Sequence, residues 1–139
     1  YFEGFPNVRA YMEGAVAEAR EKGYTETLLG RRRQIPELAS RVRAVRQAGE
    51  RQAMNAGIQG LAADIFKIAL VRLDEALEER GGTSRLILQV HDEVVLEVPP
   101  ADEVEMSEVV LDAMSGAFDL AVPLEVNLAF GDTWAGAKS

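Results

Sequence analysis

The only histidine of the chain, His91, is followed directly by two acidic residues, Asp92 and Glu93. Apolar residues lie on both sides of this group, over positions 86–90 and 94–98. Apolar runs of this length predict two β-strands joined by a tight turn, with the first strand buried on both faces. A turn at the end of a sheet exposes its side chains, and carboxylate oxygens are preferred ligands of hard divalent cations. We therefore expect candidate cation ligands at the tip of a hairpin.

The same three residues also suit a turn that does no chemistry, because Asp is common in turns. A metal-dependent hydrolase of the HD type would need several more histidines than this chain has. The sequence contains neither a Gly-x-Ser-x-Gly nucleophile elbow nor a Walker-type phosphate loop. It contains no cysteine, which excludes disulfides, thiolate metal sites and a cysteine nucleophile. Cation ligands and ordinary turn residues are the interpretations that remain.

A second group of residues with functional chemistry lies on a predicted long helix. Arg51, Asn55 and Gln59 are spaced four residues apart, so each is rotated by about 40° from the last around the helix axis. We call this row the polar ridge. It offers long hydrogen-bond donors, and the minor groove of DNA presents acceptors at every base pair, so the ridge could contact a duplex without reading its sequence. An ordinary solvated helix face is the alternative interpretation.

Two glycines, Gly57 and Gly60, lie in the interior of the same predicted helix. Each costs up to about 1 kcal/mol there relative to alanine. We expect a backbone or a duplex to approach the helix closely at these positions, although simple helix packing would also explain them. The other side of the helix carries apolar residues between positions 58 and 77, which should pack on a sheet.

Periodicity and turn residues predict the elements that position these groups. The predicted order is helix, hairpin, long helix, hairpin, helix and strand, which is an α+β fold. Asn7 suits the N-cap of the first helix, which Lys22 and Gly23 close. The other predicted elements are a hairpin of Tyr24–Leu29 and Arg32–Ile35, a helix of Val42–Glu79 that is either kinked or has first turns that form a separate short helix, the hairpin around His91, a helix of Asp102–Phe118 and a strand of Leu124–Phe130.

Charge is distributed unevenly along the chain, whose net charge is -8. Residues 31–51 include seven arginines and two glutamates, whereas residues 92–139 include eleven acidic residues and one lysine. A basic segment can contact nucleic-acid phosphate and an acidic one can bind cations, although two solvated surfaces of opposite sign would give the same counts. The composition is typical of a soluble domain, and the apolar runs are too short to predict a membrane span.

Segments along almost the whole chain resemble, in the same order, segments of the family A DNA polymerases, the bacterial DNA polymerase I group. Leu88-Gln89-Val90-His91-Asp92-Glu93 resembles the motif C hairpin of that family. Residues 50–65 resemble its long palm helix, and residues 23–33 resemble the segment that leaves its fingers. Residues 122–126 and 131–134 resemble its C-terminal strand and tail.

The resemblance implies an antiparallel palm-type sheet, whose motif C hairpin packs on long helices, together with a residual helical segment of the fingers. It places the C-terminal part of the fingers at residues 1–47 and the motif C half of the palm at residues 48–139. The 139 residues contain neither motif A nor the fingers helix that holds the incoming nucleotide. We therefore expect the chain to be a C-terminal fragment of a longer polymerase, and to be inactive alone.

The resemblance also implies the reaction, which is template-directed DNA synthesis in replication and repair. In this family the aspartates of motif A and motif C hold two Mg²⁺ ions, which promote attack of the primer 3′-hydroxyl on the α-phosphate of a nucleotide. Asp92 matches the motif C aspartate, and is thus implied to be a catalytic residue and the metal ligand of this chain. Glu93 matches its neighbour, an auxiliary catalytic carboxylate.

The implied partners are primer–template DNA, deoxynucleoside triphosphates and the rest of the parent chain, in the cytoplasm at the nucleoid and without a membrane. Four residues match positions that contact DNA, namely Arg51, Asn55, Gln59 and His91. The resemblance assigns no role to the arginines at positions 31, 32 and 33.

A function of another class stays open. The chain could be a self-standing α+β module that binds nucleic acid through its arginine-rich segment and does no chemistry. The coding sequence upstream of Tyr1 would distinguish the two, because a polymerase needs Asp-Tyr-Ser-x-x-Glu and a helix with spaced Arg, Lys and Tyr.

Overall fold

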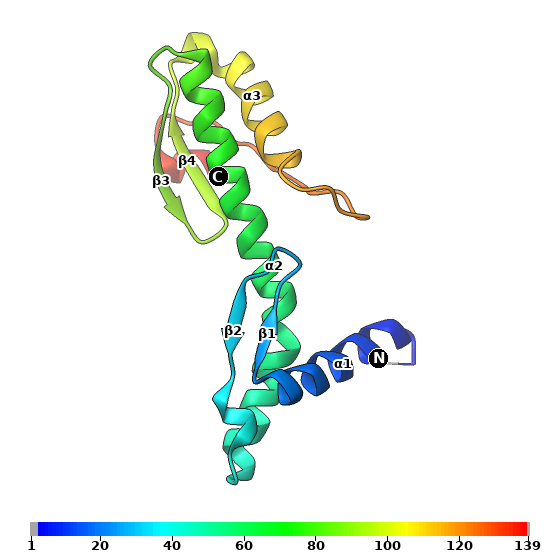
Figure 1. The fold of residues 1–139 in the computed structure, drawn as a ribbon. Coiled ribbons are helices and arrows are strands. Elements are labelled where there is room, and N and C mark those ends of the chain that lie inside the picture. Colours follow the sequence, from blue (N-terminus) through cyan, green and yellow to red (C-terminus); the bar gives the residue numbers. More distant parts are fainter. Residues whose placement is uncertain (1–2, 139) are drawn as a thin grey trace. The chain divides into compact units, whose positions relative to one another are not determined.

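The computed structural model describes residues 3–138 and divides the chain after Asp64 into two compact units, which are treated separately below (Figure 1). The α+β class is confirmed, because helices are combined with two small antiparallel hairpins. In chain order the elements are α1 (Pro6–Lys22), β1 (Tyr24–Glu26), β2 (Arg32–Gln34), η1 (Pro36–Ala39), α2 (Arg43–Arg80), β3 (Arg85–Val90), β4 (Glu93–Glu97), η2 (Pro100–Asp102), α3 (Glu103–Ser115) and α4 (Trp134–Ala137).

Helix α1 of the first unit confirms the predicted helix but corrects its start. The N-cap is Phe5. Pro6 occupies the first helical position, where its fixed φ suits the helix and its missing N–H costs nothing, so Asn7 lies inside the first turn instead of capping it. The predicted end is confirmed, because Gly23 has φ 79° and donates its N–H to the Ala19 carbonyl.

The first predicted hairpin is also confirmed, with shorter strands than expected. Strands β1 and β2 pair from Tyr24↔Gln34 to Glu26↔Arg32. The turn then takes residues 27–31, since the Thr27 N–H bonds to the Arg31 carbonyl at 2.9 Å and the Gly30 N–H bonds to the Thr27 carbonyl at 2.9 Å. Gly30 has φ 84°, a conformation that glycine adopts without steric cost.

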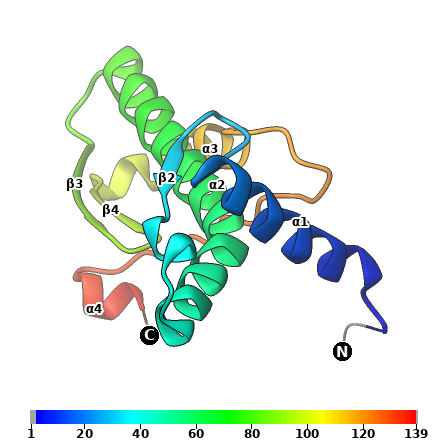
Figure 2. The same ribbon diagram turned by 60° about the horizontal axis from the view of Figure 1, so that its bottom comes forward.

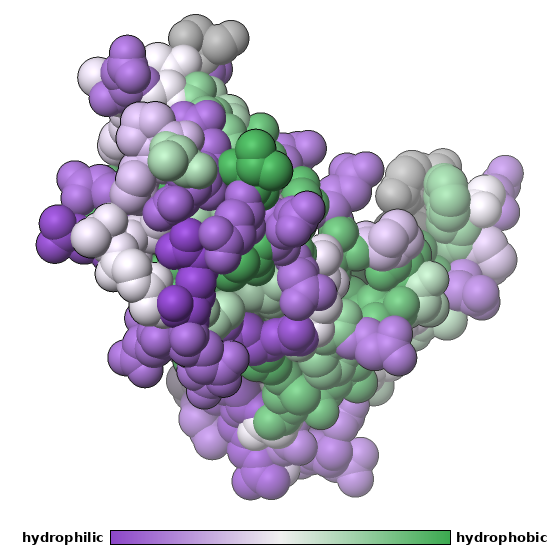
Figure 3. All heavy atoms as spheres, turned by 90° about the horizontal axis from the view of Figure 1, so that it is seen from above, coloured by the Kyte–Doolittle hydropathy of each residue, from purple (hydrophilic) through white to green (hydrophobic). Residues whose placement is uncertain are grey.

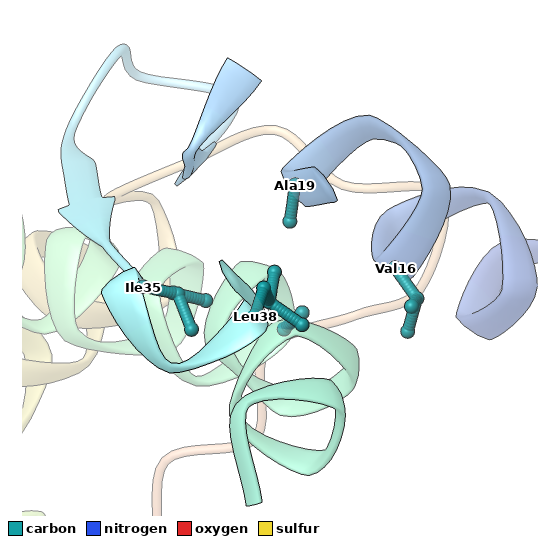
Figure 4. Close-up of a cluster of buried hydrophobic side chains, with 5 residues drawn as sticks. Val16, Ala19, Ile35 and Leu38 are labelled. Atoms are coloured by element: carbon teal, nitrogen blue, oxygen red, sulfur yellow. The ribbon is translucent and has the colours of Figure 1, made fainter. Parts of the chain in front are cut away.

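The core of the first unit joins α1, the segment around η1 and the first half of α2. Figure 4 shows the side chains of Val16, Ala19, Ile35 and Leu38 converging on one interior, to which Ala53 also belongs. Ile35 is 1% exposed, and burial of a side chain of this size stabilises the fold by roughly 1.5–3 kcal/mol.

Helix α2 is assigned as one helix without interruption, which confirms the predicted long helix. Its first turns do not form a separate short helix, because the helix runs unbroken from Arg43. The 3₁₀ helix η1 lies before the predicted range. No helix in the described part of the chain has both the length and the apolar character needed to span a membrane.

The second unit is built on the C-terminal half of α2. Its buried cluster joins Leu73 and Leu77 of α2 to α3, and side chains of the β3–β4 hairpin pack against that cluster. Figures 1 and 2 both show the hairpin and α3 beside this part of α2. Strands β3 and β4 pair antiparallel, with an irregularity in register between Leu86 and Leu88. Helix α3 ends at Ser115, short of the predicted Phe118.

The prediction that the first strand of this hairpin is buried on both faces is wrong. Ile87 is 49% and Leu88 is 40% exposed, whereas Leu86 packs against the helical cluster. A two-stranded sheet that packs on helices with one face leaves its other face open. Apolar side chains accordingly reach the surface at several places, seen as green areas in Figure 3.

The predicted strand at residues 124–130 is wrong as well. The structure assigns no strand to this segment, although it describes all of its residues. An extended segment becomes a strand only when a second strand pairs with it, and among the described residues β3 and β4 pair only with each other.

Candidate functional site

The turn between β3 and β4 consists of His91 and Asp92, because Val90 and Glu93 form the last strand pair. His91 has φ 53°, in the left-handed region. Two-residue hairpin turns require such positive φ values, and histidine tolerates them better than most residues do. The Gln89 amide donates to the His91 carbonyl at 2.7 Å and closes the turn. The predicted hairpin tip is therefore observed in the second unit.

The two carboxylates at the hairpin tip, Asp92 in the turn and Glu93 at the start of β4, differ in their surroundings. Asp92 is exposed, and within residues 3–138 its side chain has no hydrogen bond or ion pair. Glu93 is half-buried, and its Oε2 lies 2.7 Å from Lys138 Nζ. Lys138 also lies over the Trp134 ring, 4.9 Å from its centroid. Asp92 thus offers free oxygen ligands, whereas Glu93 is already neutralised.

The pairing of Lys138 with Glu93 was not predicted from the sequence. Lys138 is nevertheless conspicuous there, since it is the only basic residue between Asp92 and the end of the chain. The pairing itself could not be seen in the sequence, because 45 residues separate the two partners.

The donor chemistry of the turn suits Mg²⁺, which binds proteins through one or two carboxylates and keeps several waters. Within the described residues, no group of three or more His, Asp or Glu side chains is placed to hold a metal ion. Asp92 can therefore supply part of a cation site, and further ligands would have to come from other groups.

The polar ridge lies in the first unit, and its three residues, Arg51, Asn55 and Gln59, are exposed on α2 as predicted. The predicted site residues thus fall into two groups, one in each unit. The glycines beside the ridge have an explanation within the chain. A Cβ at Gly57 would clash with the Tyr11 hydroxyl, and one at Gly60 would lie 2.5 Å from the Thr27 methyl. Packing against the Thr27 side chain therefore accounts for Gly60, while Gly57 lies against the hydroxyl end of the Tyr11 side chain.

The arginines at 31, 32 and 33 have three different environments. Arg31 Nε lies 2.7 Å from Asp64 Oδ1, and Arg32 Nε lies 2.6 Å from Glu26 Oε2. The hydrogen bond to Glu26 raises the pKa of Arg32 above its ordinary value. Arg33 Nη2 donates a 3.3 Å hydrogen bond to the Gln52 amide oxygen. Among the described residues, acidic side chains thus neutralise two of the three guanidinium charges, those of Arg31 and Arg32.

These arginines line a pocket of about 310 Å³ between the β1–β2 hairpin and α2. Its lining combines guanidinium groups, two hydroxyls and an amide: Thr25, Thr27, Arg31, Arg32, Arg33, Ala56, Gln59 and Gly60. The pocket brings a ridge residue, Gln59, together with the arginine cluster, which spacing along the sequence did not predict. Such a lining suits an anionic, hydrogen-bonding ligand.

Comparison with known proteins gives consistent matches. Residues 1–136 match the family model described as DNA polymerase family A. The chain is 49% identical over 138 residues to the thermostable DNA polymerase I of Thermus caldophilus and 50% identical over 137 residues to the DNA polymerase I of Mycobacterium bovis. These alignments cover 99% of the chain but only 16% and 15% of the respective relatives.

A solved structure gives the same result for the fold. The POL domain of Pol1 from M. smegmatis, in complex with a DNA primer-template and dNTP, matches with a TM-score of 0.95 and 47% identity. The match covers 100% of this chain and 24% of the other.

Proposed function

The chain belongs to DNA polymerase family A, and from this premise we propose that the protein containing it is a DNA-directed DNA polymerase that extends a primer 3′-hydroxyl along a template. The observation that carries the proposal is the carboxylate of Asp92, which is exposed at the tip of a two-residue turn and has no partner within residues 3–138. It stands in the segment that resembles motif C. The relatives' name, DNA polymerase I, supports a role in replication and repair.

Asp92 would hold Mg²⁺ together with an aspartate from motif A, a segment not contained in these 139 residues. When bound, Mg²⁺ supplies Lewis-acid stabilisation of the attacking oxygen and of the pyrophosphate leaving group. The task of Asp92 is to present oxygens that no protein cation already occupies. Glu93, held by Lys138, would act as an auxiliary carboxylate beside Asp92.

His91 and the polar ridge would contact DNA. His91 is exposed at the hairpin tip, and we assign it to the primer terminus. We assign Arg51, Asn55 and Gln59 to minor-groove and backbone contacts near the insertion site, supported by their exposure on one helix. The solved relative that contains primer-template and dNTP supports these as the partners.

We assign residues 1–47 to the fingers and residues 48–139 to the palm, with the rest of the polymerase chain as the structural partner. DNA in the nucleoid as substrate implies a cytoplasmic location. We expect residues 1–139 alone not to extend a primer, because their described part holds no complete metal-binding group. A non-catalytic nucleic-acid-binding module is the second candidate, favoured by the arginine-lined pocket in the first unit.

The deciding experiment is primer extension by the intact polymerase with Asp92→Ala. We expect extension to fall by at least about a thousandfold, the usual consequence of losing a residue central to catalysis, and duplex affinity to stay within about twofold. Glu97→Ala is the matched control, because it removes an exposed carboxylate from the other end of β4 and should leave extension unchanged. Near-normal extension by Asp92→Ala would refute the catalytic assignment.

A further inference from the structure

Asp64 is the only buried charged or polar side chain among residues 3–138, at 8% exposure. Both of its oxygens are engaged by the β1–β2 turn. Thr27 Oγ1 donates to Oδ2 at 2.7 Å, and Arg31 Nε lies 2.7 Å from Oδ1. A buried carboxylate is costly unless it is paired and hydrogen-bonded, and these two contacts satisfy it.

The same turn touches α2 again one helical turn earlier, at Gly60. Arg31 Nη2 donates to the Gly60 carbonyl at 2.9 Å, and the Thr27 methyl lies where a side chain at position 60 would begin. The turn is also braced internally, because the Arg31 N–H donates to Thr27 Oγ1 at 3.2 Å. Asp64, Thr27 and Arg31 together therefore attach the turn to α2 at two successive helical turns.

Gln59 precedes Gly60 and lines the same pocket as Thr27 and Arg31. A glutamine on an exposed helix face has many rotamers, and the positions of Thr27 and Arg31 set the shape of the pocket into which Gln59 can turn. We infer that Asp64 is a positioning residue, which acts through Arg31 and Thr27 to hold Gln59 in place against the primer–template. The inference rests on the proposed function, in which Gln59 contacts the minor groove. The effect of Asp64 should then appear in the recognition of correct pairing at the primer terminus.

The test compares matched and mismatched primer termini, using kcat/KM for extension by the intact polymerase. Asp64→Asn keeps the shape of the side chain but removes its charge. We expect it to reduce the preference for the matched terminus by roughly fivefold to tenfold, as expected for one weakened hydrogen bond. Unchanged discrimination by a folded Asp64→Asn polymerase would overturn the inference.

Glu26→Gln is the matched control for charge. It removes one negative charge from the same hairpin by breaking the exposed pair with Arg32, which does not involve α2. We expect its discrimination to stay within about twofold of the unsubstituted enzyme. An equal loss in both variants would show that total charge near the arginines matters and that positioning does not.

A second pair of variants removes only one hydroxyl contact, in case Asp64→Asn fails to fold. Thr27→Val keeps the side-chain shape and loses the hydrogen bond to Asp64, whereas Thr27→Ser keeps the hydroxyl. We expect Thr27→Val to lose part of the discrimination and Thr27→Ser to retain it. Full discrimination by Thr27→Val would overturn the inference.

Gln59→Ala separates this inference from the proposed function. If Gln59 is the group that Asp64 positions, Asp64→Asn should have little further effect in a polymerase that already carries Gln59→Ala. Additive losses would overturn the inference alone. Normal discrimination by Gln59→Ala itself would overturn the assignment of Gln59 to DNA, and the inference with it.

Discussion

The two hairpins of the molecule end in turns that use a carboxylate in opposite ways. The β1–β2 turn is attached to α2 by Asp64, which is buried and engaged by Thr27 and Arg31. The β3–β4 turn carries its own carboxylate, Asp92, which is exposed and engaged by no side chain or backbone group within residues 3–138.

The difference shows that residue type alone does not tell a carboxylate that stabilises the fold from one that can bind a cation. A buried carboxylate must be satisfied by the protein itself, and once satisfied it holds its neighbours in place. An exposed carboxylate keeps its water, which a cation can replace without disturbing the fold. Glu93 combines both properties. It directly follows the β3–β4 turn, but the Lys138 ammonium group is already its partner.

The free energy of unfolding should show the difference between the two turns most clearly. We expect Asp64→Ala to lower the free energy of unfolding by about 2–3 kcal/mol, because Thr27 and Arg31 lose their acceptor and Arg31 is exposed enough to regain some hydration. Asp92→Ala should change it by no more than about 0.5 kcal/mol. Urea unfolding of the 139-residue chain measures both values. Similar losses of unfolding free energy in the two variants would contradict the distinction between a buried, structural carboxylate and an exposed, free one.

A substitution at Gly60 tests how closely the β1–β2 turn approaches α2. A Cβ at this position would lie 2.5 Å from the Thr27 methyl, so Gly60→Ala should destabilise the chain by about 1–2 kcal/mol. Gly14→Ala is the control, because open space surrounds that position in α1 and the better helix propensity of alanine should stabilise by about 0.5–1 kcal/mol. If Gly60→Ala also stabilised, the close approach would be disproved.

The smallest effect is expected at Lys138, which follows α4 and pairs with Glu93 at the start of β4. Its pair with Glu93 is largely exposed, so Lys138→Met should lower the free energy of unfolding by no more than about 0.5 kcal/mol. Methionine keeps an apolar stem beside Trp134 while removing the charge. A loss of several kcal/mol in the same urea experiment would mean that the β3–β4 tip is also held by its ion pair.

Helix ends show which features a local sequence pattern can predict. Lys22 and Gly23 predicted the end of α1, which the structure confirms, since Gly23 has φ 79° there. Asn7 failed as a cap because Pro6 is a better first residue of a helix. Patterns of this kind succeed where the cause lies within a few residues along the chain.

The predictions that failed depended on contacts between distant segments. The apolar run at 86–90 is the same whether or not a second layer covers it, and only the two-stranded arrangement left Ile87 and Leu88 exposed. The segment at 124–130 has the composition of a strand but no described strand beside it. Strand formation and two-sided burial require partners, and a local pattern does not specify them.

The amino-acid sequence by itself determined the hairpin tip at His91 and Asp92, the long helix with its polar ridge, the α+β class and the resemblance to family A DNA polymerases. Each depends on local periodicity, turn chemistry or an ordered set of motifs. Only the tertiary structure decided that Asp64 is a buried anchor, that Glu93 is paired with Lys138 and that Gly57 and Gly60 make room for Tyr11 and Thr27. The physical reason is that burial and pairing depend on which distant groups folding brings into contact.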